Sequence, residues 1–252
     1  MSKQSALSVA VIAAVCIAVS GCATSTSSSK ASQSAESSFR AGEELYAKKK
    51  YADAVEEWKK VKESSYSPEL SALAQLKIGD ALYDDEKYIE AAAEYENFRK
   101  LHPHHESSIY ALYRLGMSNY KQIGTIDVDQ TPVKNSVTYF ESFLKQYPTS
   151  PYATEVRENL ADCRLKMVQY EIYVGRFYFR SEKYPAAIKR FETTLEKSPS
   201  SPANDEALLY LGESYTLSGN RPKGKEAFDR LAKEFPASPA NEEAKKFMKK
   251  NF

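Results

Sequence analysis

The side chains best suited to catalysis or metal binding are few in this chain. All three histidines lie in His102-Pro103-His104-His105, a segment that could hold a metal ion. We favour the alternative of an ordinary turn, because the proline breaks helical spacing. Acidic pairs such as Glu43-Glu44 and Asp84-Asp85 fall in helical patterns and are typical of solvated faces. No nucleophile, base and orienting group come together, and neither a G-x-S-x-G nor an H-E-x-x-H motif occurs, so we expect no enzyme, metal or cofactor.

The thiol of Cys22 is the exception, because it is placed for covalent modification. An apolar run over residues 6–19 follows Lys3 and ends in the small residues Val19-Ser20-Gly21. This pattern resembles the lipobox of bacterial lipoproteins, in which the signal peptide, here residues 1–21, is removed and the cysteine is acylated. We therefore expect a diacylglycerol and an N-acyl lipid on Cys22. The alternative is a secretory signal with a chance cysteine near its cleavage site.

The expected lipids would anchor the chain to a membrane, because two or three acyl chains together bind durably. Ala23 follows the cysteine, and the absence of an aspartate there favours the inner leaflet of the outer membrane, with the protein on its periplasmic face. Residues 22–36 are serine-rich and predict a flexible tether. Cys163, the other cysteine outside the signal, lies in a helical pattern and is expected to be a packing residue.

From residue 37 onwards, glycines mark a repeating helical pattern. Gly42, Gly79 and Gly116 are 37 residues apart, as are Gly175 and Gly212. Large aromatic residues follow 16 positions later at Trp58, Tyr95, Phe191 and Phe228, and Phe140 holds the equivalent place in the third unit, counted back from Pro148. A period of this length indicates stacked helix pairs. The glycine of each first helix allows the second to approach closely, despite a propensity cost of about 1 kcal/mol.

Helix starts and insertions divide this array. We expect helices to begin at Ser67-Pro68, Ser150-Pro151, Ser201-Pro202 and Ser238-Pro239, where serine is a good N-cap and proline suits the first turn. Extra residues around 124–131 enlarge the third unit. A second insertion, without a breaker from Tyr152 to Arg180, predicts one helix of roughly 40 Å.

The offsets resemble the tetratricopeptide repeat, so we predict an all-α fold: an α-solenoid of about five helix pairs with a long central helix and a C-terminal capping helix. Repeats 1–3 would occupy residues 37–150. The long linking helix, repeats 4–5 and the cap would occupy residues 151–252.

A set of aromatic residues predicts a binding surface on the first helices. Tyr46, Tyr83, Tyr120 and Phe179 each stand four residues after a repeat glycine. In a tetratricopeptide stack this position faces the concave groove, where tyrosine hydroxyls could pair with a bound peptide. The alternative is that these rings fill gaps between repeats.

The whole chain resembles the BamD family, the tetratricopeptide lipoproteins of the outer-membrane β-barrel assembly (BAM) complex. The resemblance rests on the lipobox, five repeats and an enlarged third unit. Its most specific stretches are Leu101 to His104 with Tyr110 to Gly116, Asp129 to Thr131, and Tyr170 to Glu192. It implies a non-enzymatic scaffold.

The resemblance also implies partners. The C-terminal repeats would dock on the periplasmic domains of BamA, with Arg190 at the contact. The N-terminal repeats would receive unfolded outer-membrane proteins, with Tyr83, Tyr113 and Tyr120 near that groove. Other Bam lipoproteins are further expected partners. Nucleic acid is not expected, because 35 basic residues stand against 34 acidic ones.

Two other periplasmic tetratricopeptide scaffolds are the alternatives. A Tol–Pal-linked protein would begin with a coiled coil and lack a lipobox. A pilus pilotin would have repeats nearer the usual 34 residues and no long middle helix.

Overall fold

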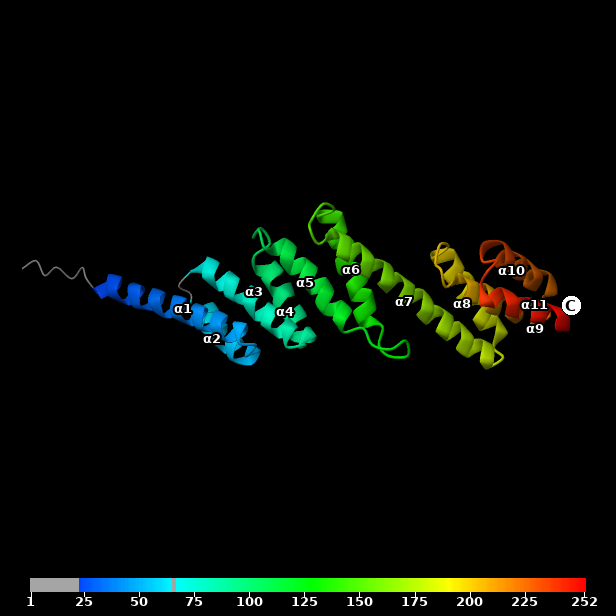
Figure 1. Cartoon of the computed structure of the whole chain (residues 1–252), viewed down its shortest axis with the longest axis horizontal. Coiled ribbons are helices and arrows are strands. Elements are labelled where there is room, and N and C mark those ends of the chain that lie inside the picture. The colour runs from blue at the N-terminus through cyan, green and yellow to red at the C-terminus, as the bar shows by residue number, and fades with distance from the viewer. Residues whose placement is uncertain (1–22, 65–66) are drawn as a thin grey trace, which may run out of the picture.

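A computed structural model describes residues 23–64 and 67–252, and these residues form α-helices joined by short turns (Figure 1). The expected signal peptide 1–21, with Val19, Ser20 and Gly21, and the acylation site Cys22 lie outside the described residues. The helices are α1 Ala23–Ala47, α2 Tyr51–Glu63, α3 Pro68–Asp84, α4 Tyr88–Leu101, α5 Ser108–Lys121, α6 Thr131–Gln146, α7 Ala153–Arg180, α8 Tyr184–Lys197, α9 Asn204–Leu217, α10 Arg221–Glu234 and α11 Pro239–Asn251.

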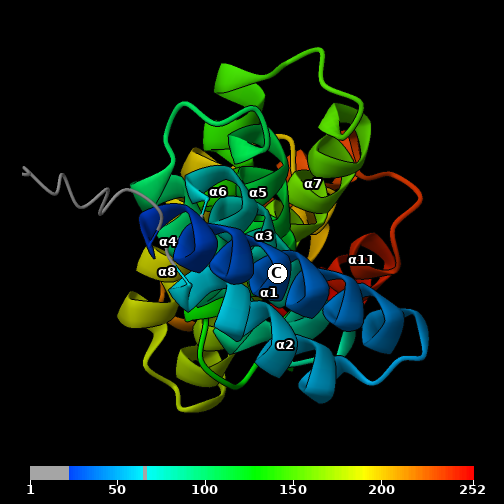
Figure 2. The same ribbon diagram turned by 90° about the vertical axis from the view of Figure 1, so that its left-hand side faces the viewer.

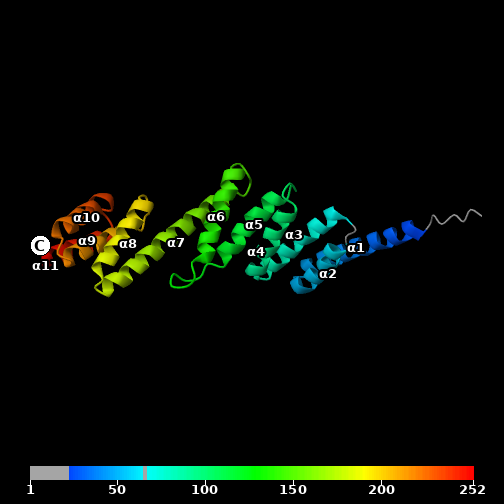
Figure 3. The same cartoon turned by 180° about the vertical axis from the view of Figure 1, so that it is seen from behind.

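Consecutive helices pair along an elongated array. Figures 1 and 3 show the pairs following one another from α1 to α10, with α11 packed at the far end. Figure 2 views the array from its N-terminal end, with α1 in front. The first helices of neighbouring pairs also touch, as α5 contacts α7 and α7 contacts α9. This arrangement confirms the predicted α-solenoid of five helix pairs with a capping helix.

Each pair is held by a glycine that lies against an aromatic ring. A Cβ atom added at Gly42, Gly79, Gly116, Gly175 or Gly212 would lie under 3.0 Å from the ring of Trp58, Tyr95, Phe140, Phe191 or Phe228, respectively. These five rings are almost completely buried. Because the rings cannot move without leaving the core, only glycine allows this spacing of the two helices.

The long helix α7 belongs to two hydrophobic cores. Its first half supplies Val156, Leu160 and Cys163 to the core that contains α5 and α6. Its second half supplies Val168 and Ile172 to the core formed with the helices that follow. The 28-residue helix confirms the predicted long central helix. Cys163 is a buried packing residue, and burial raises the pKa of its thiol to about 12.

The serine-rich segment differs from the tether that we expected at residues 22–36. In the structure, α1 begins at Ala23, so the described part of this segment continues the first helix of repeat 1. No proline or glycine interrupts residues 23–40. Once the packed part of the helix is formed, adding further residues avoids the cost of nucleation.

The predicted helix starts are correct at two of the four Ser-Pro pairs. The Ser67 side chain accepts a hydrogen bond from the Leu70 backbone N–H at the start of α3, and the Ser238 side chain accepts from the Ala240 N–H at the start of α11. The other two predictions are wrong, because Ser150-Pro151 and Ser201-Pro202 each form a turn before α7 and α9. At Ser150 the backbone carbonyl accepts from the Ala153 N–H, which closes that turn.

The enlarged third unit forms the loop between α5 and α6. In this loop the Asp129 carboxylate accepts from the Thr131 backbone N–H at 2.9 Å. The Gln130 side-chain amide donates to the carbonyls of Ile126 and Val128. The Asp-Gln-Thr sequence therefore orders the end of the loop and leads into α6.

Among the helices of residues 23–64 and 67–252, none is both long and apolar enough to cross a bilayer.

We expect Gly175→Ala to lower the free energy of unfolding by roughly 1–3 kcal/mol, measured by urea denaturation followed by circular dichroism. The added Cβ would overlap the Phe191 ring. This overlap should outweigh the gain of about 1 kcal/mol in helix propensity. The control is Gly124→Ala, whose nearest neighbour, Val128, is 48% exposed and free to move. Equal stability of Gly175→Ala and the unaltered protein would contradict the proposed packing constraint.

Candidate functional site

The aromatic residues expected in the groove lie at the seams between neighbouring first helices. Tyr46 of α1 donates a hydrogen bond to the Asp84 carboxylate of α3. Tyr113 and Tyr120 of α5 donate to Glu155 and Asp162 of α7, at 2.8 and 2.9 Å. Each of these three hydroxyls therefore joins one repeat to the next.

These contacts differ from the expectation that the hydroxyls are free for a bound peptide. Burial, and then the hydrogen bond to Asp162, raises the pKa of Tyr120 to about 12. Burial is also the main cause of the raised pKa of Tyr113, followed by the bond to Glu155. Both hydroxyls thus stay protonated at neutral pH and act as donors between repeats. Their rings are only half-buried, so part of each ring stays accessible.

The remaining two aromatic residues make seam contacts through their rings. The Arg114 guanidinium lies 3.7 Å from the centroid of the Tyr83 ring, which is cation–π geometry. The Phe179 ring packs edge-on against Tyr184 and Tyr210, with centroid distances of 5.9 and 5.2 Å. All members of the set therefore contact neighbouring side chains, and a binding role for their exposed parts stays a prediction.

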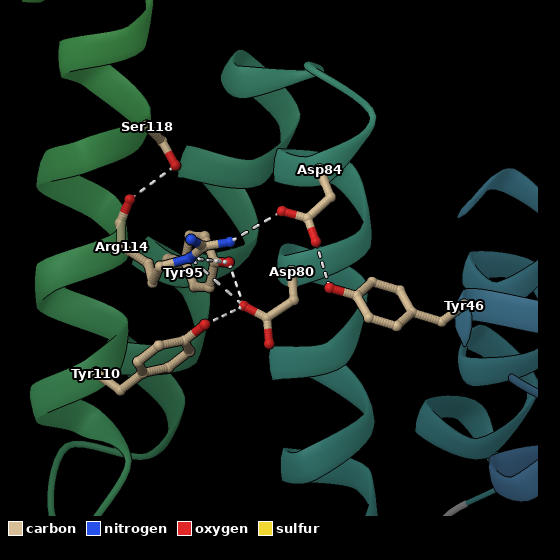
Figure 4. Close-up of polar contacts among 7 residues, drawn as sticks. All are labelled: Tyr46, Asp80, Asp84, Tyr95, Tyr110, Arg114 and Ser118. Atoms are coloured by element: carbon tan, nitrogen blue, oxygen red, sulfur yellow. Dashed lines mark hydrogen bonds and ion pairs between the residues drawn. The ribbon is translucent and has the colours of Figure 1, made fainter. Parts of the chain in front are cut away.

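Arg114 is the centre of a polar cluster that connects three repeats (Figure 4). Its Nε atom donates to the Tyr95 hydroxyl at 3.1 Å and lies 3.6 Å from an Asp80 oxygen. Its Nη2 atom lies 3.6 Å from Asp84, which also accepts from Tyr46. The cluster therefore links α1, α3, α4 and α5.

Asp80 completes this cluster as an acceptor for two tyrosines. Tyr95 and Tyr110 both donate to the same Asp80 oxygen at 2.6 Å. Burial, and then the charge of Asp80, raises the pKa of both hydroxyls. The side chains of Arg114 and Asp80 are only 15% and 18% exposed. At this depth an unpaired charge is costly, so the two residues depend on one another.

Sequence reasoning missed Arg114 and Asp80 as partners. The available signal was their place beside repeat glycines, since Asp80 follows Gly79 and Arg114 stands two residues before Gly116.

The histidine segment 102–105 makes local contacts. His105 accepts from the Ser107 backbone N–H at 3.0 Å, and its other ring nitrogen lies 3.1 Å from Glu69. Within the described part of the chain, no cluster of three metal-ligating side chains occurs.

Arg190 lies beside a separate cavity of about 230 Å³ between α6, α7 and α8. Its guanidinium is 2.7 Å from the Glu171 carboxylate of α7. Met167, Val168 and Tyr170 contribute apolar lining, while Lys134 and Lys197 add positive charge. The surroundings of Arg190 therefore carry three basic groups and one acidic group around an apolar floor.

The family of the chain follows from comparison with known proteins. Residues 31–227 match the family model YfiO, described as an outer membrane lipoprotein. Because the match covers most of the chain, the protein belongs to this family of outer-membrane lipoproteins. Its membership confirms the predicted resemblance to the BamD family, the outer-membrane location and the expectation that the chain is not an enzyme.

Similar curated proteins carry a more specific name. The chain is 28% identical over 116 residues to outer membrane protein assembly factor BamD of Vibrio cholerae, covering 42% of this chain and 48% of that protein. It is 26% identical over 107 residues to the assembly factor BamD of Caulobacter vibrioides, covering 42% and 35%. The matched region thus spans about half or less of these relatives.

Solved structures are more distant. The TPR2AB-domain:pHSP90 complex of yeast Sti1 gives a TM-score of 0.42 at 14% identity, covering 86% of this chain and 84% of that chain. A likeness at this level supports no argument about function.

We expect Arg114→Met to lower the free energy of unfolding by roughly 2–4 kcal/mol, because it leaves Asp80 and Asp84 without their cation. Adding Asp80→Asn should restore part of this loss, which urea denaturation of both single variants and the double variant measures as a coupling energy. The control is Arg164→Met, which removes an exposed pair with Glu141 and should change stability by less than about 0.5 kcal/mol. Additive losses at Arg114 and Asp80 would show that the cluster does not act as a unit.

Proposed function

We propose that the protein is a non-enzymatic scaffold subunit of the BAM complex. The observation that carries this proposal is the family match over residues 31–227, together with relatives named as assembly factors. An array of helix pairs suits such a role, because it presents an extended surface to which other proteins can bind. Its proposed partners are the periplasmic domains of BamA, unfolded outer-membrane proteins and other Bam lipoproteins.

The proposed BamA contact is the cavity beside Arg190. An apolar floor surrounded by Lys134, Arg190 and Lys197 suits a partner loop that carries a carboxylate and an apolar side chain. In the protein without a partner, Arg190 forms an ion pair with Glu171. A partner carboxylate would therefore share or replace this internal pair, at an exposed position where the exchange costs little.

The proposed substrate surface is the face formed by the first helices, near Tyr46, Tyr83, Tyr113, Tyr120 and Phe179. Because three of these hydroxyls bond to carboxylates, we assign binding to the accessible parts of the rings. Aromatic rings bury large apolar areas with little loss of side-chain entropy. Unfolded outer-membrane proteins expose alternating apolar side chains that such rings would contact.

We further propose that Cys22 carries the lipid expected of the family, as a diacylglycerol and an N-acyl chain. The anchor would hold α1 near the inner leaflet of the outer membrane and leave the later repeats in the periplasm.

Arg190→Glu should weaken binding to purified BamA periplasmic domains at least tenfold, because it places two carboxylates together at the proposed contact. Biolayer interferometry with the matched domains would measure the dissociation constant. The control is Arg230→Glu on α10, an arginine whose side chain is 41% exposed and, among the residues that the structure describes, pairs with Glu234 of its own helix. Unchanged affinity of Arg190→Glu, with a circular dichroism spectrum equal to that of the unaltered protein, would remove Arg190 from the interface.

Cys22→Ser should release the protein from membranes into the soluble periplasmic fraction, because no acyl chain can be attached. Cell fractionation and immunoblotting would measure the distribution, and co-purification with BamA would show whether the released protein still docks. Full membrane retention in cells depleted of BamA would contradict lipid anchoring at this residue.

A further inference from the structure

A second cavity, of about 560 Å³, lies where the turn before α5 meets the turn between α6 and α7. Its aromatic lining comes from Tyr110, Tyr147 and Tyr152, and two prolines, Pro148 and Pro151, stand between the last two tyrosines. Its volume is in the range typical of ligand sites. None of these residues belongs to the set that the glycine spacing selects.

The tyrosines of this cavity are fixed before any ligand arrives. The rings of Tyr152 and Tyr113 are stacked, with centroids 4.3 Å apart and an interplanar angle of 11°. Tyr110 lies 6.1 Å from Tyr152, centroid to centroid, and its hydroxyl bonds to Asp80. A ligand would therefore meet a rigid aromatic wall and would not lose affinity to ordering it.

The backbone of the proline-containing turn is fixed as well. The Arg157 guanidinium donates to the Pro148 carbonyl at 2.7 Å. The Tyr147 N–H donates to Phe143 at the end of α6, and the Ser150 N–H donates back to Tyr147. The two prolines add their own restriction, because each ring fixes φ. The rim of the cavity thus keeps its shape.

Two hydroxyls and one carboxylate at this cavity are available to a ligand. Within residues 23–64 and 67–252, the hydroxyls of Tyr147 and Tyr152 donate to no protein acceptor, unlike those of Tyr110 and Tyr113. Glu106, an exposed carboxylate on the rim, has no ion pair in the same part of the structure. The nearby cation Arg157 is engaged with Pro148. The cavity therefore offers aromatic faces, two free donors and one free negative charge.

We propose that this cavity binds an extended, proline-containing peptide segment with a basic residue, supplied by a partner protein. Grooves of aromatic rings recognise the polyproline II conformation, which is already ordered before binding. Such a segment has no internal hydrogen bonds, so its carbonyls can accept from Tyr147 and Tyr152. Its basic side chain would pair with Glu106.

A saccharide is the less favoured occupant. Sugars bind by stacking on open ring faces, whereas one face of Tyr152 is covered by Tyr113. Pro148 and Pro151 line the cavity beside the tyrosine rings and would add apolar contact to an extended peptide. The inference is independent of BamA docking, because the cavity lies on the turns before α5 and α7, whereas Arg190 is on α8.

The test is fluorescence anisotropy with the mature lipoprotein in detergent micelles and a labelled peptide Arg-Pro-Leu-Pro-Pro-Leu-Pro. Saturable binding should weaken at least tenfold when all prolines of the peptide are replaced by alanine, and at least threefold when its arginine is replaced by glutamate. Glu106→Gln should make the affinities for the arginine and glutamate peptides equal, because it removes the carboxylate that we propose pairs with the basic side chain of the peptide.

Two tyrosine variants locate the site. Tyr152→Ala should weaken binding at least tenfold, and Tyr147→Phe, which keeps the ring and removes only the hydroxyl, should weaken it two- to fivefold. The control is Tyr173→Ala, a 38%-exposed tyrosine later in α7 that does not line the cavity. No saturable binding, equal binding of the alanine peptide, or binding of a chitooligosaccharide that Tyr147→Phe weakens would each overturn the proposal. Because BamA is absent from the assay, none of these results depends on the docking at Arg190.

Discussion

The close approach of glycine and aromatic ring within each helix pair is the constraint on which the rest of the structure depends. With a Cβ excluded at all five positions, the two helices of a pair are held at a spacing set by one buried ring. The same first helices carry side chains that meet the next repeat, such as Tyr46, which stands one helical turn after Gly42 and bonds to Asp84. The packing within a pair and the contact with the next repeat therefore lie close together on the first helix. A propensity cost near 1 kcal/mol per glycine is small beside the packing that each allows.

The two halves of the array use different donor side chains at these seams. In the N-terminal half, tyrosine hydroxyls donate to carboxylates of the following repeat, and Arg114 balances the charge of Asp80 and Asp84. In the C-terminal half, Phe179 replaces the tyrosine and meets Tyr210 through its ring, while Arg176 donates to Glu206 at 2.7 Å across the same seam. Helix α7 takes part in seams of both halves. Directional hydrogen bonds to carboxylates therefore join the repeats on both sides of this helix.

Sequence reasoning succeeded where one helix or one pair determines the outcome. The glycine–aromatic offsets and the unbroken stretch to Arg180 are local patterns, so the helix pairs and the long helix followed from them. The partners of Arg114 could not be predicted in the same way, because they lie on three other helices whose relative rotation depends on packing. The start of α7 was missed for a related reason: Ser150-Pro151 suits a helix start and a turn equally well, and only the neighbouring core decides.

One proposed binding site, the cavity beside Arg190, lies where the long helix α7 interrupts the regular array. The cavity beside Arg190 runs along the middle of α7, between the two cores that this helix joins, so neither core covers it. The proline-lined cavity lies at the turn before α7, and the same turn recurs before α9, where the Ser201 N–H donates to Ser198. Stacking of units buries the faces between repeats and leaves their turns and outer faces available to another protein. The interruption at α7 adds a surface to those that every repeat carries, and we expect partner specificity to combine the two.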